Sequence, residues 1–154
     1  MVSFQIHTLA QTQKLAQSFS KLLKKGDIIA LYGTLGVGKT AFARFVIQNL
    51  CHKAEDVPSP TFTLLQTYET SAFDIYHFDL YRLKKADEVF ELGIEDAFYD
   101  GVSLIEWPDK MGHILPIKKM LKIDISVEND MHIFNFSSEN LTWQERLDTW
   151  NVSI

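Results

Sequence analysis

Residues 28–40 decide the fold of this chain: they are Ile28-Ile29-Ala30-Leu31-Tyr32-Gly33-Thr34-Leu35-Gly36-Val37-Gly38-Lys39-Thr40. The run from Ile28 to Tyr32 is short and uninterrupted, and it is typical of a strand buried on both faces of a sheet. Three glycines then follow between positions 33 and 38, where they allow the backbone to curl tightly. From Ala41 to Leu50 apolar residues recur at helical spacing. The stretch therefore predicts a strand, a loop and a helix in that order.

The loop from Gly33 to Thr40 matches the Walker A pattern G-x-x-x-x-G-K-[ST]. In this pattern backbone N–H groups point inward at phosphate oxygens, and the helix N-terminus adds partial positive charge. Lys39 supplies a cation for the β- and γ-phosphates, and Thr40 supplies a hydroxyl oxygen for Mg²⁺. An ordinary glycine-rich turn is the alternative, but the position between a strand and an amphipathic helix favours a phosphate-binding loop. We predict nucleotide contacts from Gly33, Thr34, Leu35, Gly36, Val37, Gly38, Lys39, Thr40 and Ala41.

The rest of the chain alternates between helical and strand-like segments. Helices are predicted over residues 12–25 and 86–98 and near the C-terminus, where Thr142 and Glu145 have the spacing of a capping box. Strands are predicted over residues 61–68, 75–81, 102–105, 121–127 and 132–136. Intermixed strands and helices predict an α/β fold, a sheet with parallel and antiparallel strands flanked by helices. We expect one domain over residues 1–154.

Composition excludes several classes of protein. The chain has 154 residues and a formal net charge of -5, which argues against binding of nucleic acid through bulk positive charge. Its one cysteine, Cys51, cannot form an internal disulfide, so a reducing cytosol is the expected compartment. The sequence has neither a signal peptide nor an apolar run long enough to span a membrane. We expect a cytoplasmic protein that does not associate with membranes.

Two acidic residues are candidates for the metal and catalytic groups of a nucleotide site. Glu106 directly follows the apolar run 102–105 and resembles a Walker B acid, which holds Mg²⁺ or polarises the attacking water. Asp79 lies in the predicted strand 75–81 on the same face as Ile75 and His77, and from there it is expected to project toward the metal. For both, a solvated strand end is the alternative. Thr61 is either a switch residue that senses the γ-phosphate or a hydroxyl that stabilises a turn.

A missing motif and a small number of arginines indicate which nucleobase the site binds and which reaction it catalyses. The chain lacks the Asn-Lys-x-Asp signature that recognises guanine, so adenine is favoured. It has only three arginines, Arg44, Arg82 and Arg146, which is few for a small-molecule kinase that clamps two phosphorylated substrates. Arg82 is expected either near the phosphates or a partner, or in a surface ion pair.

Several segments together resemble the bacterial TsaE (YjeE) family, the ATPase of tRNA threonylcarbamoyladenosine biosynthesis. They are Gly33 to Thr40, Ser59-Pro60-Thr61-Phe62-Thr63-Leu64, His77-Phe78-Asp79-Leu80-Tyr81-Arg82-Leu83, Glu91-Leu92-Gly93-Ile94 and Leu104-Ile105-Glu106-Trp107-Pro108. The resemblance extends from about Thr12 to Pro116. The combination of the His77-Phe78-Asp79-Leu80-Tyr81-Arg82 and Ile105-Glu106-Trp107-Pro108 segments is much more specific than Walker A alone.

The resemblance implies a slow P-loop ATPase that works with the TsaB and TsaD proteins. In the family, ATP turnover supports repeated cycles in which the partner complex forms threonylcarbamoyladenosine at position 37 of tRNAs reading codons that begin with A, so contact with tRNA is indirect. By matching position, Gly36, Gly38 and Lys39 bind phosphate, Thr40 and Glu106 hold Mg²⁺, and Asp79 assists hydrolysis or contacts nucleotide. Thr12 matches a threonine near the nucleotide, and Trp107 is implied beside the site, with a core tryptophan as the alternative.

The chain departs from the family pattern in three places. Thr34 stands where the family usually has aspartate. After the last hairpin, where some members have a basic residue near the nucleotide, this chain has Asp130-Met131-His132, so that contact is absent or is made by His132. The tail from Leu141 to Ile154 is not matched to the family pattern, so the resemblance assigns it no role; it carries two tryptophans, which we expect to close the core rather than to form a partner surface.

Two other functions are compatible with a Walker A match. A small-molecule kinase transfers the γ-phosphate to a metabolite instead of water. A non-catalytic nucleotide switch binds ATP without hydrolysing it. The presence of the candidate catalytic acids Glu106 and Asp79 argues against a non-catalytic switch. The family resemblance favours the accessory ATPase over both the kinase and the switch.

Overall fold

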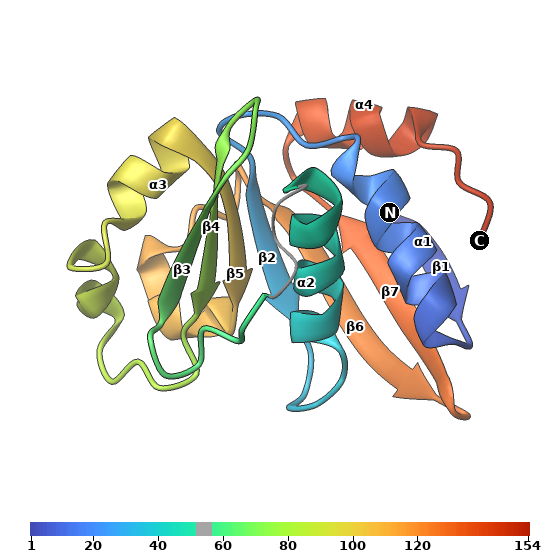
Figure 1. The fold of residues 1–154 in the computed structure, drawn as a ribbon, viewed down its shortest axis with the longest axis horizontal. Coiled ribbons are helices and arrows are strands. Elements are labelled where there is room, and N and C mark those ends of the chain that lie inside the picture. Colours follow the sequence, from blue (N-terminus) through green and yellow to red (C-terminus); the bar gives the residue numbers. More distant parts are fainter. Residues whose placement is uncertain (52–56) are drawn as a thin grey trace.

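The computed structural model describes residues 1–51 and 57–154, and its centre is a seven-stranded sheet in the order β1-β7-β6-β2-β5-β4-β3 (Figure 1). The strands are β1 (Val2–Ile6), β2 (Ile28–Tyr32), β3 (Leu65–Glu69), β4 (Asp74–Asp79), β5 (Gly101–Glu106), β6 (Leu121–Glu128) and β7 (Met131–Ser137). The helices are α1 (Leu9–Ser20), α2 (Lys39–Leu50), α3 (Ile94–Asp100) and α4 (Leu141–Thr149), with two 3-10 helices, η1 (Ala86–Phe90) and η2 (Pro108–Ile114). The predicted α/β class is confirmed.

The centre of the sheet is parallel and its edges are antiparallel. β2 pairs in parallel with β5 and β6, and β5 pairs in parallel with β4. β3 and β7 then pair with their neighbours in antiparallel register. Because parallel strands end at the same edge, Glu106 at the end of β5 lies opposite both Asp79 of β4 and Leu31 of β2. The sheet topology therefore brings the two predicted acids beside the loop that follows β2.

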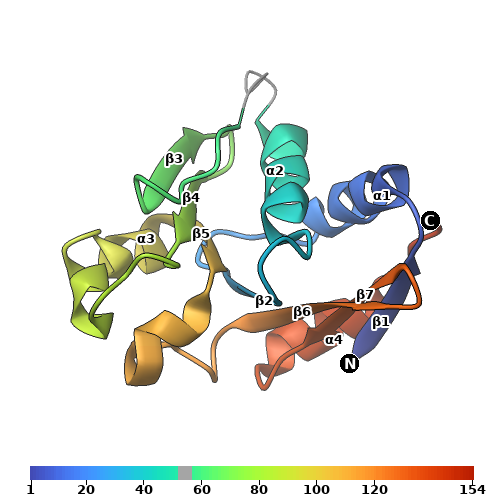
Figure 2. The same ribbon diagram turned by 90° about the horizontal axis from the view of Figure 1, so that it is seen from below.

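β2 contributes to two apolar cores, one on each face of the sheet. Ile29 and Leu31 pack in the core beneath α1 and α2, whereas Ile28 and Ala30 pack in the core beneath α3, η1 and η2. Alternate side chains of a strand point to opposite faces, so a strand covered on both sides needs an apolar residue at every position. This explains the uninterrupted apolar run. Figure 2 shows α1 and α2 side by side on one face.

The predicted strand over residues 61–68 was wrong in its first half. Residues 61–64 form a turn in which the Leu64 N–H donates to the Pro60 carbonyl at 2.6 Å, and Leu64 has a left-handed φ of 66°. The strand begins only at Leu65. The turn is stabilised by a further bond from the Asp79 N–H to the Leu64 carbonyl at 3.0 Å. Local β propensity is overridden here by tertiary hydrogen bonds.

Helix boundaries also differ from the predicted ones. The first helix begins at Leu9 because Thr8 and Gln11 form a capping box, and it ends at Ser20. The helical stretch 86–98 is divided into η1 and α3 at Gly93, whose φ is 78°. α4 is capped by Asn140 rather than Thr142: the Asn140 Oδ1 accepts from the Trp143 N–H at 3.2 Å.

β1 was not predicted, and the strand predicted over residues 75–81 ends at Asp79. In β1 exposed Ser3 and Gln5 alternate with Val2, Phe4 and Ile6, which point inward, so the period-2 signal of a half-buried edge strand was present. The other predicted strands and the hairpin between β6 and β7 are confirmed. Among the described residues, none of the helices has the length and apolar character needed to cross a membrane.

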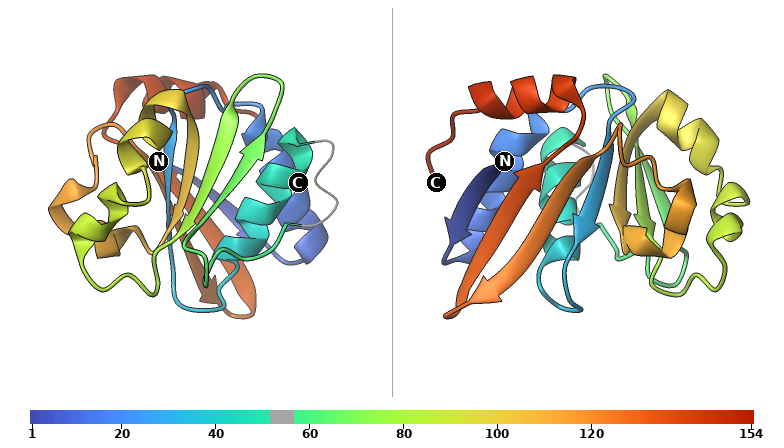
Figure 3. Two further views of the ribbon diagram at one scale, coloured as in Figure 1. Left: turned by 60° about the vertical axis from the view of Figure 1, so that its left-hand side comes forward. Right: turned by 180° about the vertical axis from the view of Figure 1, so that it is seen from behind.

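The tryptophans of the tail close the core, as expected. Trp143 is fully buried and stacks on Phe19 of α1, with ring centres 6.2 Å apart. Trp150 packs edge-on against Phe4 of β1 at 5.0 Å. Figure 3 shows α4 across the end of the sheet at which β2 begins, opposite the β2–α2 loop. The tail thus completes the fold on the side away from the predicted nucleotide site.

A buried ion pair attaches α4 to the start of β2. Both guanidinium NH groups of Arg146 donate to the Asp27 carboxylate, at 2.7 and 2.9 Å, and Arg146 also donates to the Leu22 carbonyl. Asp27 is 7% exposed. Because an uncompensated buried charge is costly, removing one partner destabilises more than the pair itself stabilises.

We predict that Arg146→Met lowers the free energy of unfolding by about 2–3 kcal/mol, because it leaves Asp27 buried without its partner. Urea denaturation of the full chain measures this. Lys122→Met is the matched control, since Lys122 and Asp124 are about half exposed and 4.0 Å apart; it is expected to cost less than about 1 kcal/mol. Equal effects of the two substitutions would contradict the prediction.

The β2–α2 loop is packed so closely at Gly33 that no side chain fits. Gly33 has a φ of 146°, and a Cβ there would lie 2.6 Å from Val37 Cγ1 and 2.7 Å from the Ile125 carbonyl oxygen. We predict that Gly33→Ala lowers the free energy of unfolding by about 3 kcal/mol, through overpacking and backbone strain.

Gly36→Ala is the control for this second prediction. Gly36 also has a positive φ, 78°, but a Cβ there meets no atom within 4 Å among the described residues. Only the left-handed backbone is then penalised, at about 1–2 kcal/mol. Thermal or urea unfolding compares the variants, and a Gly36→Ala variant as unstable as Gly33→Ala would show that steric contact is not the cause.

Candidate active site

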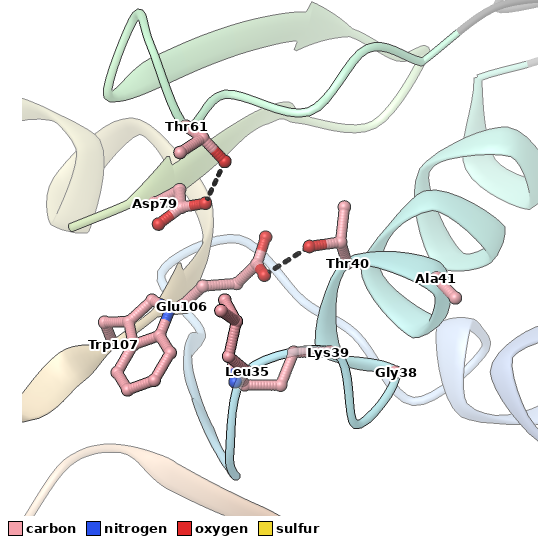
Figure 4. A pocket seen from close by; sticks show the side chains of 10 residues that line it. Leu35, Gly38, Lys39, Thr40, Ala41, Thr61, Asp79, Glu106 and Trp107 are labelled. Atoms are coloured by element: carbon pink, nitrogen blue, oxygen red, sulfur yellow. Dashed lines mark hydrogen bonds between the residues drawn. The ribbon is translucent and has the colours of Figure 1, made fainter. Parts of the chain in front are cut away.

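The first turn of α2 is bonded directly to the end of β5. The Thr40 hydroxyl donates to Glu106 Oε1 at 2.5 Å (Figure 4). Glu106 is 2% exposed, and its other oxygen, Oε2, lies 2.7 Å from Nε2 of His77. The Walker A hydroxyl and the predicted Walker B acid therefore meet, although they are 66 residues apart in sequence. A solvated strand end, the alternative for Glu106, is excluded.

Lys39 lies under the loop with its ammonium turned back onto the backbone. Its Nζ donates to the Gly33 and Thr34 carbonyls at 2.5 and 2.9 Å and lies 4.2 Å from the centre of the Trp107 ring. Burial lowers the pKa of Lys39 from its ordinary value of 10.5, while Glu106, Asp79 and Asp109 act in the opposite direction. The loop carbonyls and the indole thus hold the ammonium where incoming phosphate oxygens can replace them.

Asp79 is held by two hydrogen bonds at the end of β4. Its Oδ2 accepts from the Thr61 hydroxyl at 2.7 Å, and its Oδ1 accepts from the Tyr81 N–H at 3.0 Å. Asp79 is 4% exposed, so the solvated alternative is excluded for this acid as well. Thr61, in the turn before β3, thus contacts a site carboxylate, and it is also 2.8 Å from the Ser59 hydroxyl.

These groups surround one cavity of about 270 Å³. Figure 4 shows Thr61 and Asp79 on one side of it and the α2 N-terminus on the other. Its lining consists of Leu35, Gly36, Gly38, Lys39, Thr40, Ala41, Thr61, Asp79, Glu106 and Trp107. Every lining residue except Trp107 belongs to the predicted contact set, and Trp107 was expected beside the site from the family resemblance. The fold therefore gathers residues from four separate parts of the sequence.

Four other predicted contacts do not line the cavity. Gly33 and Thr34 offer their carbonyls to Lys39, and Val37 is buried beneath the loop. Thr12 is buried in α1, and its contact with nucleotide stays a prediction. His132 is paired with Ile6 and Val127 in the sheet and is not part of the cavity lining.

In the part of the chain that the structure describes, Arg82 does not form the surface ion pair that was one of its two expected positions, and its approach to the phosphates or to a partner stays a prediction. Its guanidinium lies 4.3 Å from the ring centre of Phe62, which is 80% exposed. Within residues 1–51 and 57–154 it makes no ion pair, and it does not line the cavity.

Two residues at the site were not predicted from the sequence. Tyr81 packs its ring against Trp107 at 5.1 Å, and His77 contacts Glu106. Trp107 has the left-handed backbone (φ 58°) that a bulky residue adopts only when its surroundings impose it. His77 could have been found, since it is two residues before Asp79 in a strand and so points to the same face.

The residues present fit a magnesium nucleotide. No side chain caps α2 in the described structure, so its first N–H groups remain available for phosphate oxygens. Outside residues 52–56, no group of three His, Cys, Asp or Glu side chains could bind a metal alone. Mg²⁺ suits such a site, because it is commonly held by one or two carboxylates together with phosphates and water. Thr40 and Glu106 are the residues that would hold it.

Comparison with known proteins agrees with the resemblance. Residues 6–133 match the profile of the family described as threonylcarbamoyl adenosine biosynthesis protein TsaE. The tRNA threonylcarbamoyladenosine biosynthesis protein TsaE of Rickettsia bellii is 42% identical over 130 residues, which cover 84% of this chain and 90% of the relative. The protein of the same name from Rickettsia prowazekii is 40% identical, over 88% and 96% of the two chains.

A solved structure confirms the predicted P-loop type of fold. The crystal structure of YdiB from Bacillus subtilis superimposes with a TM-score of 0.75 at 25% identity, over 96% of this chain and 91% of that one. The family match extends from β1 into β7, so it contains the loop, both acids and the strands that carry them. The chain belongs to the TsaE family.

Proposed function

We propose that this protein is an ATPase that binds and hydrolyses Mg-ATP to support the TsaB–TsaD complex in forming threonylcarbamoyladenosine at position 37 of tRNAs reading codons that begin with A. One observation carries the proposal: the hydroxyl of the Walker A threonine, Thr40, is bonded to the buried carboxylate of Glu106. This is the arrangement in which P-loop enzymes hold their metal. The family description supports the pathway, and the site supports the reaction.

The residues of the cavity can each take part in hydrolysis. Lys39 leaves the Gly33 and Thr34 carbonyls and binds phosphate oxygens, where its charge offsets the negative charge of the transition state. Mg²⁺, when bound, neutralises charge on the β- and γ-phosphates. Asp79 and Glu106 offer carboxylate oxygens that can orient a water for attack on the γ-phosphorus, as the bond to the β-phosphate oxygen breaks. Thr61 holds Asp79 in place for this role.

The size of the site supports an accessory role. The cavity of about 270 Å³ is lined by loop, metal and catalytic groups, which leaves little room for a second substrate. The net charge of -5 also disfavours a direct grip on tRNA through bulk electrostatics. We therefore assign the joining chemistry to the partner proteins and expect the turnover of this chain by itself to be slow. We also propose that it works in the cytoplasm, the compartment expected from its single cysteine.

We predict that Lys39→Ala and Glu106→Gln each reduce ATP hydrolysis about 10²-fold. Lys39→Ala removes the positive charge that offsets the negative charge of the transition state, and Glu106→Gln removes the carboxylate that would hold Mg²⁺ or orient the attacking water. Phosphate release from ATP and Mg²⁺ measures this. Lys14→Ala is the matched control, since Lys14 is an exposed residue of α1 outside the cavity. Wild-type rates in Lys39→Ala or Glu106→Gln would remove the roles assigned to these residues.

Multiple-turnover modification of adenosine 37 is the second measurement. TsaB, TsaD, ATP, Mg²⁺ and tRNA are incubated with and without this protein, and modification beyond one cycle is expected only in its presence. Unchanged cycling without it would overturn the accessory role. Recovery of the γ-phosphate on a metabolite would instead indicate a kinase, and ATP binding without hydrolysis, even with partners, would indicate a switch.

A further inference from the structure

His77 is a fully buried histidine that uses only one of its two ring nitrogens. It lies in the middle of β4 and is 0% exposed. Its Nε2 is 2.7 Å from Glu106 Oε2, whereas Nδ1 has no hydrogen-bond partner in the described part of the chain. Buried polar atoms without a partner are uncommon in folded proteins because each retains its desolvation penalty.

The position of His77 would suit an apolar side chain better than histidine. Ile75, which points to the same face of β4, and Leu104, which is paired with His77 in β5, are buried and apolar, so packing there requires no polar group. The contact with Glu106 is therefore the feature that distinguishes histidine at this position. Among the described residues of the site, His77 is hydrogen-bonded to Glu106 alone.

The two oxygens of Glu106 are held from opposite sides. Oε1 accepts from the Thr40 hydroxyl of α2, and Oε2 faces His77 of β4. An ionised carboxylate can only accept, so the proton of this second bond belongs to Nε2 of the imidazole. With both oxygens anchored, the carboxylate group cannot rotate about its terminal bond, and Oε1 stays directed toward the first turn of α2.

We propose that His77 is a positioning residue that orients the Glu106 carboxylate for divalent-cation binding at Thr40. Its effect on hydrolysis is exerted through Glu106, because His77 does not line the cavity. Groups that hydrogen-bond to a metal ligand commonly change metal affinity 10–100-fold when they are removed. The inference rests on the proposed function, since it concerns the cation that accompanies ATP.

Two substitutions separate this role from a purely structural one. His77→Leu fills the buried space but removes the donor, whereas His77→Gln keeps an N–H donor at about the distance of Nε2. Ser103→Ala is the matched control: Ser103 is also fully buried in the sheet, and among the described residues its hydroxyl has no hydrogen-bond partner, Glu106 included. Thermal unfolding shows which variants are folded.

The measurement is equilibrium binding of a fluorescent, non-hydrolysable ATP analogue, titrated with Mg²⁺ and repeated in EDTA. We expect His77→Leu to raise the half-saturating Mg²⁺ concentration about 10–100-fold and to leave binding in EDTA unchanged. His77→Gln is expected to restore the wild-type Mg²⁺ dependence, and Ser103→Ala to retain it. A structural role would instead weaken binding equally with and without Mg²⁺.

The ring of His77 gives a second readout that requires no variant. ¹⁵N NMR of the wild-type protein is expected to show the proton on Nε2, because Glu106 accepts there. A proton on Nδ1 alone would overturn the proposal, even if His77→Leu fails to fold.

The outcomes distinguish this inference from the proposed function. If the wild-type protein responds to Mg²⁺ and a folded His77→Leu variant responds identically, the positioning role is wrong while the proposed function stands. Failure of His77→Gln to improve on His77→Leu also contradicts the positioning role. If the wild-type protein binds the analogue equally with and without Mg²⁺, the proposed function itself is wrong.

Discussion

The hydrogen bond between Thr40 and Glu106 joins the two halves of the site, and its geometry depends on the parallel centre of the sheet. β2, β5 and β4 end at the same edge, so the loop after β2 and the acids that end β5 and β4 are neighbours. Both apolar cores support this arrangement, because each face of β2 is packed against helices. The chemistry of the site is thus a consequence of strand order, and a change of order would separate its residues.

The three charged residues buried around the cavity each form hydrogen bonds. Lys39, Asp79 and Glu106 are each nearly inaccessible and each bonded, to loop carbonyls, to Thr61 and to Thr40 respectively. Burial of an unpaired charge is costly, so these contacts hold the groups in place before nucleotide arrives. The left-handed backbone of Trp107, which brings its indole against Lys39, is local strain of the kind found at functional sites.

At the opposite end of the sheet, the C-terminal tail stabilises the fold. There α4 places Trp143 and Trp150 against α1 and β1, and Arg146 binds Asp27 just before β2. None of these residues reaches the cavity. The contacts of the tail therefore lie at one end of the sheet, and the loop after β2 with the buried Lys39, Asp79 and Glu106 lies at the other. This separation lets the tail secure β2 without contacting the residues that carry the chemistry.

Local patterns in the sequence were sufficient to predict the strand, loop and helix of residues 28–50 and to select Glu106 and Asp79 as candidate acids. Apolar periodicity and the Walker A spacing each involve residues that are close together in the sequence, so these predictions need no knowledge of distant contacts. Patterns of this kind missed the turn at residues 61–64, β1 and His77. The turn depends on hydrogen bonds to Pro60 and from Asp79, and the purpose of His77 depends on an acid that lies 29 residues away in sequence. β1 carries the period-2 pattern of a half-buried edge strand and could have been predicted from the sequence. Only the tertiary structure decided the turn and the partner of His77, since contacts between distant residues outweighed the preferences of each segment.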